Sequence, residues 1–257
     1  MSTAIATEAK ISAKDVTKIY QTKKNSFQAL ERVSFDVFPH EFVSFVGASG
    51  CGKSTLLRIL AGLEEITTGS IQIAGFEING PGADRGMVFQ SYTLFPWLNV
   101  RQNIEFGLTL QNVPLMEKRR ISEHFMEMVS LQRFANSFPK ELSGGMKQRV
   151  AIARALANKP EVLLMDEPFG ALDPMTKGTM QEMLLDIWKK EKMTVIFITH
   201  DIEEAIFLSE RVYVMDAHPG RIKQEVIIPA TLKKEGKDSA EFIQLKKQIV
   251  ALIGPHD

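Results

Sequence analysis

The sequence predicts an α/β fold: a mostly parallel sheet flanked by helices, with an antiparallel β-subdomain and an inserted helical subdomain. Three observations support this prediction. Short apolar runs recur along the chain and indicate buried strands. Helix-length amphipathic segments lie between several of these runs. A glycine-rich loop follows one run and opens a helix, an arrangement typical of phosphate binding.

That loop, Gly47–Thr55, fits the pattern G-x-x-x-x-G-K-[ST]. Phe42–Val46 before it predicts a buried strand, and Ser54–Ala61 after it predicts a helix. Backbone N–H groups of such a loop converge on a phosphate, and the helix N-terminus adds about half a positive charge. The sequence therefore predicts a P-loop NTPase core. Its nucleotide-binding residues are Gly47, Ala48, Ser49, Gly50, Cys51, Gly52, Lys53, Ser54 and Thr55.

Within this loop, Lys53 is expected to reach the β- and γ-phosphates, and the Ser54 hydroxyl to hold Mg²⁺. We interpret Cys51 as a small residue at a variable position rather than as a redox switch. It is the only cysteine, so the chain has no internal disulfide.

Composition limits the function classes. The 257 residues carry zero formal net charge, so no global basic field suggests a nucleic-acid partner. No apolar run approaches the roughly 18 residues of a membrane span. The N-terminus lacks the pattern of a signal peptide. A 44% hydrophobic content suits a globular domain with a substantial core.

Before the loop, Ile11–Tyr20 and Phe27–Phe38 alternate loosely and predict antiparallel strands. Tyr20 either stacks on a purine ring or is a half-buried strand residue, and spacing alone favours the strand residue. After the loop helix, we expect a turn at Thr68–Ser70 and a strand at Ser70–Ala74.

Met87–Phe89 predicts a short strand that ends at Gln90. This amide either contacts Mg²⁺ or the attacking water, or is a solvated loop residue; the pattern does not decide between them. The apolar segment Tyr92–Leu98 follows and contains Pro96. It is either core filler or a patch that meets a partner.

Amphipathic spacing then predicts helices over Val100–Gln111, Met116–Ser130 and Gly145–Ala157. This block suggests an inserted subdomain. The expected organisation is an ATPase core with β-subdomain at 1–90 and 158–230, a helical subdomain at 91–157, and a tail with a short helix at 231–257.

The last of these helices opens with a second anion-binding sequence. Ser143 is a typical N-cap residue, and Gly144 and Gly145 leave their N–H groups unshielded. Two glycines after the cap weaken a helix, which favours a function over routine capping.

Two further strands deliver polar groups at their ends. Val162–Met165 is followed by Asp166 and Glu167. We expect Asp166 to be a Mg²⁺ partner and Glu167 to be the base that accepts a proton from water. Thr194–Ile198 precedes His200, which we place on the phosphate side of the sheet.

At the C-terminal end, Arg211–Asp216 and Gly220–Ile228 predict a hairpin joined through Ala217–Gly220. Glu241–Ile253 predicts an amphipathic helix, with Lys246 directed away from its apolar face.

In combination, these motifs resemble the nucleotide-binding subunits of ABC transporters. The family signature LSGGQ occurs as Leu142–Met146, with Met146 in place of glutamine. The resemblance implies ATP and Mg²⁺ as cofactors, and it implies that Tyr20 stacks on adenine. It assigns catalysis to Glu167, His200, Gln90 and Lys53, and Mg²⁺ to Ser54, Gln90 and Asp166. Further nucleotide contacts are expected from Ser143, Gly144, Gly145 and Asp173.

The resemblance also implies partners. A second copy of the chain, arranged head to tail, would complete each ATP site with its Ser143–Gly145 turn. The Tyr92–Leu98 region would receive a helix of a membrane permease, on the cytoplasmic face of the membrane, with an extracytoplasmic solute-binding protein acting indirectly. Four segments are similar to importer ATPases for nitrate, sulfonate or taurine: Val88–Gln90, Leu94–Leu98, His200–Ala205 and His218–Ile222.

Three alternatives have other sequence requirements. An ABC-type ATPase that moves no solute usually carries long coiled coils or two cassettes, which 257 residues do not accommodate. A P-loop kinase would not need the Ser143–Gly145 helix end. A non-catalytic binding module would not need the intact set of Lys53, Asp166 and Glu167.

Overall fold

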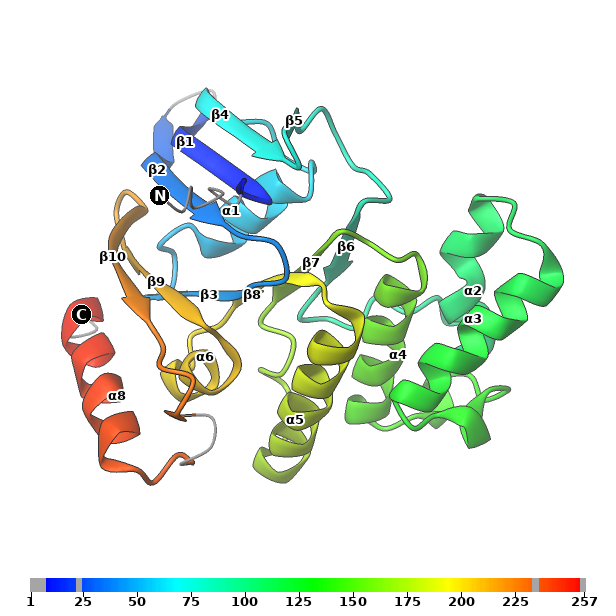
Figure 1. The fold of residues 1–257 in the computed structure, drawn as a ribbon. Helices are drawn as coiled ribbons and strands as arrows, with labels where there is room; N and C mark the ends of the chain where they lie inside the picture. The colour runs from blue at the N-terminus through cyan, green and yellow to red at the C-terminus, as the bar shows by residue number, and fades with distance from the viewer. Residues whose placement is uncertain (1–7, 22–24, 233–235, 255–257) are drawn as a thin grey trace, which may run out of the picture. The chain divides into compact units, whose positions relative to one another are not determined.

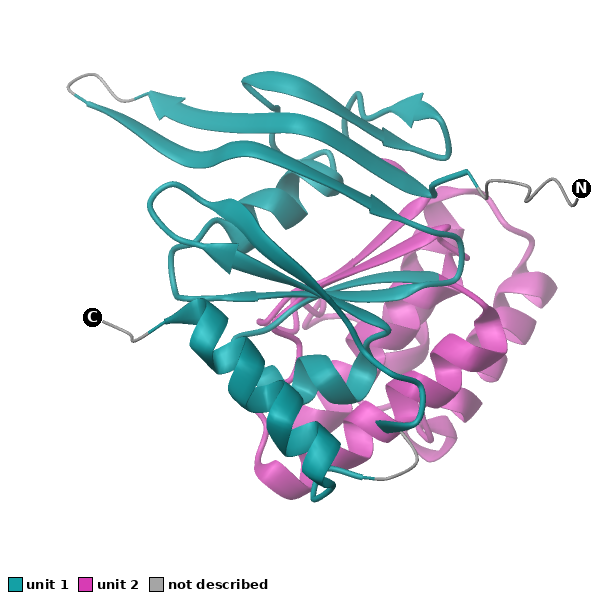
Figure 2. Cartoon of the chain, turned by 60° about the vertical axis from the view of Figure 1, so that its left-hand side comes forward, with its two compact units in different colours: residues 1–81, 194–257 teal, residues 82–193 magenta. Residues whose placement is uncertain are grey.

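The computed structural model describes residues 8–21, 25–232 and 236–254. They divide into two compact units, which Figure 2 shows in different colours. The first unit takes the chain up to Pro81 and again from Thr194, and the second takes Gly82–Met193. The predicted helical subdomain, 91–157, lies within the second unit.

The first unit contains the predicted antiparallel sheet (Figure 1). β1 pairs with β2 on one side and with β4 on the other, antiparallel in both cases. Ile11 and Val16 of β1 are fully buried, as the alternation predicts. The strands, in the order β2-β1-β4-β5, are Ser26–Val37, Ile11–Gln21, Thr68–Ile73 and Phe76–Glu77.

The predicted turn at Thr68–Ser70 is wrong, because β4 already begins at Thr68. Gly69 has a φ of 96°, and the register with β1 shifts beside it. A Cβ at Gly69 would lie 2.5 Å from the Asp15 carbonyl oxygen. The glycine therefore marks a β-bulge inside a strand, which has the same sequence signature as a turn.

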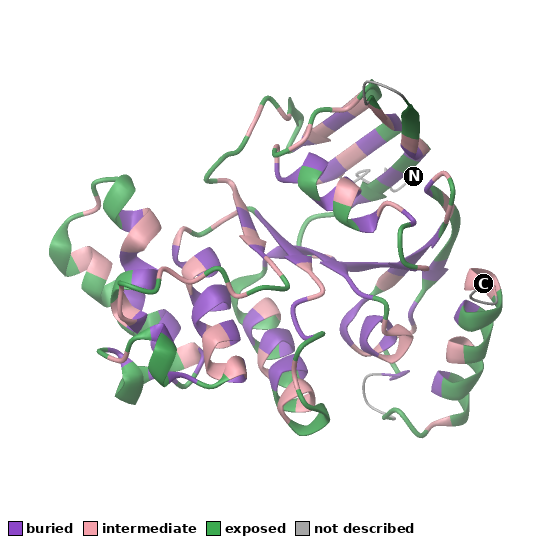
Figure 3. Ribbon diagram, turned by 180° about the vertical axis from the view of Figure 1, so that it is seen from behind, coloured by how far each residue is buried: buried purple, intermediate pink, exposed green. Residues whose placement is uncertain are grey.

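The first unit also contains four strands of a mostly parallel sheet, in the order β10-β9-β3-β8. β3 runs parallel to both β8 and β9, while β9 and β10 form the predicted antiparallel hairpin. Every residue of β3 and β8 is buried (Figure 3), because parallel strands are covered on both faces. Their bounds are Phe42–Gly47 for β3, Thr194–Ile198 for β8, Arg211–Asp216 for β9 and Arg221–Ile227 for β10.

The helices of this unit are α1 (Lys53–Leu60), α6 (Ile202–Leu208) and α8 (Ala240–Ile253). The sequence did not predict α6, whose seven residues are too short for a clear periodic pattern. The C-terminal helix α8 packs against α6 and β9 through buried side chains that include Phe242 and Ile249. Lys246 lies outside this apolar cluster, as predicted, with its side chain 44% exposed and its Nζ paired with Glu203 of α6 at 2.5 Å.

The second unit contains a parallel strand pair, β6 (Arg85–Val88) and β7 (Val162–Asp166), as predicted. The three predicted helices of the 91–157 region are present. Helix α4 packs against α2, α3, α5 and β6. Two single-turn 3₁₀ helices, Gln132–Phe134 and Pro139–Glu141, were not predicted. The α-helices are α2 (Val100–Leu110), α3 (Leu115–Met128), α4 (Gly144–Ala157) and α5 (Pro174–Glu191).

Candidate active site

The glycine-rich loop connects β3 to α1 in the first unit, as the sequence predicts. Gly52 is the N-cap of α1 and has a φ of 90°. No side chain caps this helix, so its first N–H groups point out of the helix end toward the loop. Ser54 lies exposed in the first turn of α1, and Thr55 follows it half-buried. This geometry fits a phosphate group.

Close packing makes two of the loop glycines obligatory. A Cβ at Gly47 would lie 2.6 Å from the Met215 carbonyl oxygen of β9. A Cβ at Gly52 would lie 2.6 Å from Leu30 Cδ2 and 2.8 Å from the Ala29 carbonyl oxygen, both in β2. Strands β9 and β2 therefore hold the loop in its curled shape.

The ammonium group of Lys53 lies over this loop. Its Nζ donates hydrogen bonds to the carbonyl oxygens of Gly47, at 2.8 Å, and Ala48, at 3.0 Å. The Cys51 side chain is completely buried beneath it, with Sγ 3.5 Å from Lys53 Nζ. Burial agrees with the interpretation of Cys51 as a packing residue. Lys53 thus carries a positive charge to the place where the motif predicts β- and γ-phosphates.

Tyr20 lies in β1, on the part of the first sheet that borders the loop. Its neighbour Lys18 is the register partner of Leu30, the residue that contacts the loop at Gly52. The Lys18 Nζ lies 4.8 Å from the centre of the Tyr20 ring. Tyr20 is half-buried.

His200 follows β8, the parallel neighbour of β3. The carboxyl ends of these two strands lie together, because Ile198 pairs with Phe45 and the Thr199 N–H bonds the Phe45 carbonyl. His200 is exposed there. The first unit therefore brings the loop and His200 to one edge of its parallel strands, where ligands of α/β sheets bind.

The second unit collects another group of predicted residues. Gln90 follows β6, Asp166 is the last residue of the parallel strand β7, and Glu167 follows it. A Cβ at Gly170 would lie 3.4 Å from Gln90 Nε2 and 3.8 Å from Glu167 Oε2. The amide and the carboxylate therefore flank one exposed glycine, and Asp166 precedes them at the strand end.

Glu167 has a left-handed backbone, with a φ of 44°. Its carbonyl accepts a hydrogen bond from the Gly170 N–H at 3.1 Å, which closes a tight turn directly after the strand. Such a conformation is uncommon for a residue other than glycine. Nothing in the sequence pattern predicted it.

Ser143 is the N-cap of α4, and its Oγ accepts a hydrogen bond from the Met146 N–H at 3.3 Å. The adjacent glycines lack room for side chains. A Cβ at Gly144 would lie 2.8 Å from the Tyr92 hydroxyl oxygen, and one at Gly145 would lie 2.7 Å from Thr176 Cγ2. Packing inside the unit is therefore one reason for these glycines.

Asp173 is the N-cap of α5, and its carboxylate accepts a hydrogen bond from the Thr176 N–H at 3.0 Å. Hydrogen bonds from the Thr176 side chain and backbone lower the pKa of Asp173 below its usual value. This local role accounts for the carboxylate at the start of α5. A nucleotide contact from Asp173 remains a prediction.

The apolar segment Tyr92–Leu98 is not core, since none of its residues is buried and Trp97 is 69% exposed. The Asn103 side chain of α2 fixes its backbone, accepting from the Phe95 N–H at 2.9 Å and donating to the Leu98 carbonyl at 2.9 Å. Arg154 of α4 donates to the Thr93 carbonyl at 2.8 Å.

A groove of about 620 Å³ lies along this segment, lined by Thr93, Phe95, Phe106, Leu110 and Arg154 among others. The Phe95 ring packs against Phe106 in a tilted arrangement with centroids 4.3 Å apart, and the Arg154 guanidinium lies 5.5 Å from the centre of the Phe95 ring. Asn103 and Arg154 were missed by sequence reasoning. A signal was available for Asn103, because a polar residue on the buried side of a predicted helix needs a partner.

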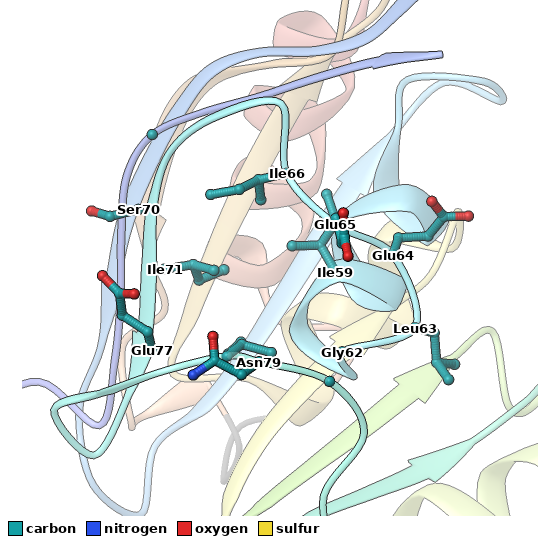
Figure 4. A pocket seen from close by; sticks show the side chains of 13 residues that line it. Ile59, Gly62, Leu63, Glu64, Glu65, Ile66, Ser70, Ile71, Glu77 and Asn79 are labelled. Atoms are coloured by element: carbon teal, nitrogen blue, oxygen red, sulfur yellow. The ribbon is translucent and has the colours of Figure 1, made fainter. Parts of the chain in front are cut away.

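A separate cavity of about 480 Å³ lies in the first unit (Figure 4). Its lining includes the carboxylates of Glu64, Glu65 and Glu77, which repel phosphates. It is therefore unsuitable for a nucleotide. Over the described ranges, no cluster of three or more His, Cys, Asp or Glu side chains could hold a metal ion.

Comparison with known proteins decides the family. Residues 30–170 match the protein family described as ABC transporter. The chain belongs to this family. It is 48% identical over 247 residues to the nitrate import ATP-binding protein NrtD of Synechocystis sp., covering 93% of each chain. It is 45% identical over 240 residues to the aliphatic sulfonates import ATP-binding protein SsuB of Bacillus cereus, covering 93% of this chain and 94% of that protein.

Solved structures of ABC cassettes show the same fold. A dimeric ATP-binding cassette, in a post-hydrolysis state with ADP and Pi, has a TM-score of 0.75 and 35% identity. The match covers 86% of this chain and 99% of that one. The chain is thus an ABC ATP-binding subunit, and ATPase activity follows from its family.

None of the helices that the structure describes is long and apolar enough to span a membrane.

Proposed function

We propose that this ABC subunit hydrolyses ATP to power uptake of a small anion of the nitrate or sulfonate type through a separate permease. The observation that carries the proposal is the near full-length similarity to import ATP-binding proteins for nitrate and for aliphatic sulfonates. A phosphate transfer to an acceptor, as in a kinase, is the alternative. It is tested by measuring ATP consumption in the absence of any acceptor.

The loop and its helix end bind the ATP phosphates, with Lys53 offsetting charge on the β- and γ-oxygens. The fit rests on the crowded glycines Gly47 and Gly52, which leave backbone N–H groups unshielded. Tyr20 stacks on adenine. Ser54, Gln90 and Asp166 supply the hard oxygen donors that Mg²⁺ requires, and the ion when bound neutralises phosphate charge.

Glu167 accepts a proton from the attacking water, and His200 donates a hydrogen bond to the γ-phosphate. The tight turn holds the backbone of Glu167 in one conformation. The reaction needs no covalent intermediate with the protein. Phosphoryl transfer depends mostly on such positioning and on charge stabilisation.

A second copy of the chain completes each site through Ser143, Gly144 and Gly145 at the start of α4. The dimeric state of a related cassette supports this arrangement. Two copies arranged head to tail give two equivalent sites, as expected for an isologous dimer. ATP would favour the closed dimer, and hydrolysis would release it.

The groove along Tyr92–Leu98 receives a helix of the permease. It is lined by the half-buried rings of Phe95 and Phe106, and the exposed Trp97 lies next to Phe95. With a backbone fixed by Asn103 and Arg154, this surface suits an amphipathic helix. Helix α4 carries both Arg154 and the Ser143 cap, so it links the proposed permease groove to the proposed dimer contact. The subunit then lies at the cytoplasmic face of the membrane, and a solute-binding protein delivers the anion from the other side.

The experiment is co-purification of the chain with the permease encoded beside its gene. Trp97→Ala and Phe95→Ala should retain the ATPase activity of the isolated subunit and reduce permease recovery several-fold. Phe76→Ala is the control, because Phe76 is 78% exposed but lies in β5, outside the groove. Equal recovery of all three variants would show that this groove is not the permease site.

A further inference from the structure

Helix α6 carries two neighbouring glutamates in its first turn, and their surroundings differ. The side chain of Glu203 is 43% exposed and pairs with Lys246 of α8. Glu204 is only 2% exposed, and its carboxylate accepts a hydrogen bond from the Thr199 hydroxyl at 2.5 Å. A carboxylate loses its hydration when it is buried, so it needs a partner inside the protein, and a hydroxyl can supply a short charge-assisted bond.

The same hydroxyl closes a turn around His200. Because it donates its proton to Glu204, it has lone pairs left to accept with. It accepts a hydrogen bond from the Asp201 N–H at 3.0 Å, which spans His200. The Asp201 carboxylate in turn accepts from the Glu204 N–H at 3.2 Å. Glu204 is therefore connected to the residue before His200 through its side chain and to the residue after it through its backbone.

This turn is also tied to β3, the strand that precedes the phosphate loop, because the Thr199 N–H donates to the Phe45 carbonyl at 3.3 Å. Asp201 is the N-cap of α6. In an ordinary capping box, the third residue of the helix would accept directly from the N-cap N–H. Here the Thr199 hydroxyl is inserted between Glu204 and the Asp201 N–H. The hydrogen bonds consequently extend past His200 into the sheet, which a cap of α6 alone does not require.

We propose that Glu204 is a positioning residue, which sets the place of His200 relative to the phosphate loop through the Thr199 hydroxyl. A side chain follows its backbone, so a turn closed on both sides of His200 limits where its ring can lie. The inference rests on the role proposed for His200 in ATP hydrolysis, and not on the permease, the dimer or the transported anion.

The test is steady-state ATP hydrolysis by the full chain. Glu204→Met nearly keeps the size of the side chain and removes the acceptor. Its kcat should fall by about ten- to a hundredfold, the cost of a misplaced catalytic group, with its KM for ATP within about twofold of wild type. Glu204→Gln retains an acceptor oxygen and should recover most of the turnover. Glu203→Met is the matched control and should hydrolyse ATP at the wild-type rate, because Glu203 pairs with α8 and not with the turn.

A paired substitution separates positioning from a purely structural role. Glu204→Met removes the acceptor of the buried Thr199 hydroxyl, which should lower the thermal stability. Adding Thr199→Val removes the hydroxyl as well, so the double variant should recover most of that stability. Its kcat should stay low, because no bond then closes the turn around His200. A return of kcat together with stability would show that the bond serves folding alone, and would overturn the inference.

His200→Ala distinguishes failure of this inference from failure of the proposed function. If Glu204 acts through His200, adding Glu204→Met to His200→Ala should slow hydrolysis no further. A further loss in that double variant, or a normal kcat of Glu204→Met beside a slow His200→Ala, overturns the role of Glu204 and leaves that of His200 intact. Wild-type turnover of His200→Ala would contradict the function proposed for His200 itself, and the inference with it.

Discussion

At the scale of single residues, backbone conformation and packing decide which side chains are possible at the site. Gly52 must be a glycine for two reasons, its φ of 90° and the close approach of β2. Glu167 is held in a left-handed conformation that most side chains avoid. Such strain persists only where the surrounding structure enforces it, and it concentrates at functional sites.

Gly52→Ala separates these two reasons when it is compared with Gly75→Ala. Gly75 has a φ of 81°, but a Cβ there meets nothing within 4 Å. Both variants should lose about 1 kcal/mol of unfolding free energy from the backbone, measured by urea denaturation. Only Gly52→Ala should lose further stability and ATP binding, because its methyl group overlaps Leu30 and Ala29. Equal behaviour of the two variants would contradict the packing argument.

Glu167→Gln keeps the size of the side chain and the preference of the backbone, and removes only the base. We expect ATP binding to persist and phosphate release to fall by a factor of about 10² or more. Glu182→Gln, an exposed glutamate of α5, is the control and should hydrolyse ATP at the wild-type rate. Unchanged turnover of Glu167→Gln would remove this carboxylate from the reaction.

At the scale of elements, the N-terminal ends of helices supply several of the groups proposed to bind the nucleotide. α1 begins without a side-chain cap and so directs its N–H groups toward the phosphate loop. α4 begins with Ser143, and α8 begins with Ser239, whose Oγ accepts from the Phe242 N–H. These two helices have the same length and the same type of cap, but only α4 carries the family signature.

This pairing allows a matched test of the signature serine. Ser143→Ala and Ser239→Ala should each cost about 1 kcal/mol of stability, the usual value of an N-cap. Thermal unfolding would measure this cost. ATP hydrolysis should fall strongly in Ser143→Ala alone, since its hydroxyl is proposed to meet the partner's nucleotide. If both variants lost activity in proportion to their loss of stability, Ser143 would act only as a helix cap.

At the scale of the whole molecule, the chain divides its proposed chemistry between two compact units. The first holds the phosphate loop, Tyr20 and His200, and the second holds Gln90, Glu167 and the Ser143–Gly145 turn. Function at this scale is proposed to require a second copy of the chain. In that dimer, the phosphate loop of one protomer lies close to the Ser143–Gly145 turn of the other.

Ser49→Cys and Ser143→Cys, introduced together into a Cys51→Ser, Glu167→Gln background, should report the dimer. Ser49 is exposed on the phosphate loop, and Ser143 is exposed at the start of α4. A short bis-maleimide should cross-link two protomers when ATP is present, and much less without it. Each single-cysteine protein is a control. Absence of cross-linked dimer with ATP, judged on a denaturing gel, would exclude the head-to-tail arrangement.

The sequence by itself determined the elements that depend on local pattern. Buried strands such as Phe42–Gly47 and Thr194–Ile198, the phosphate loop and the cap Ser143 follow from apolar runs, glycine spacing and capping chemistry. These features act over a few residues, so the order of residues suffices to predict them.

Only the tertiary structure decided the features that depend on partners far along the chain. The bulge at Gly69, the left-handed Glu167 and the Asn103 and Arg154 anchors all arise this way. Each depends on which backbone or ring a distant segment brings near. Tertiary packing sets these contacts, so they cannot be predicted from the spacing of residues within one segment.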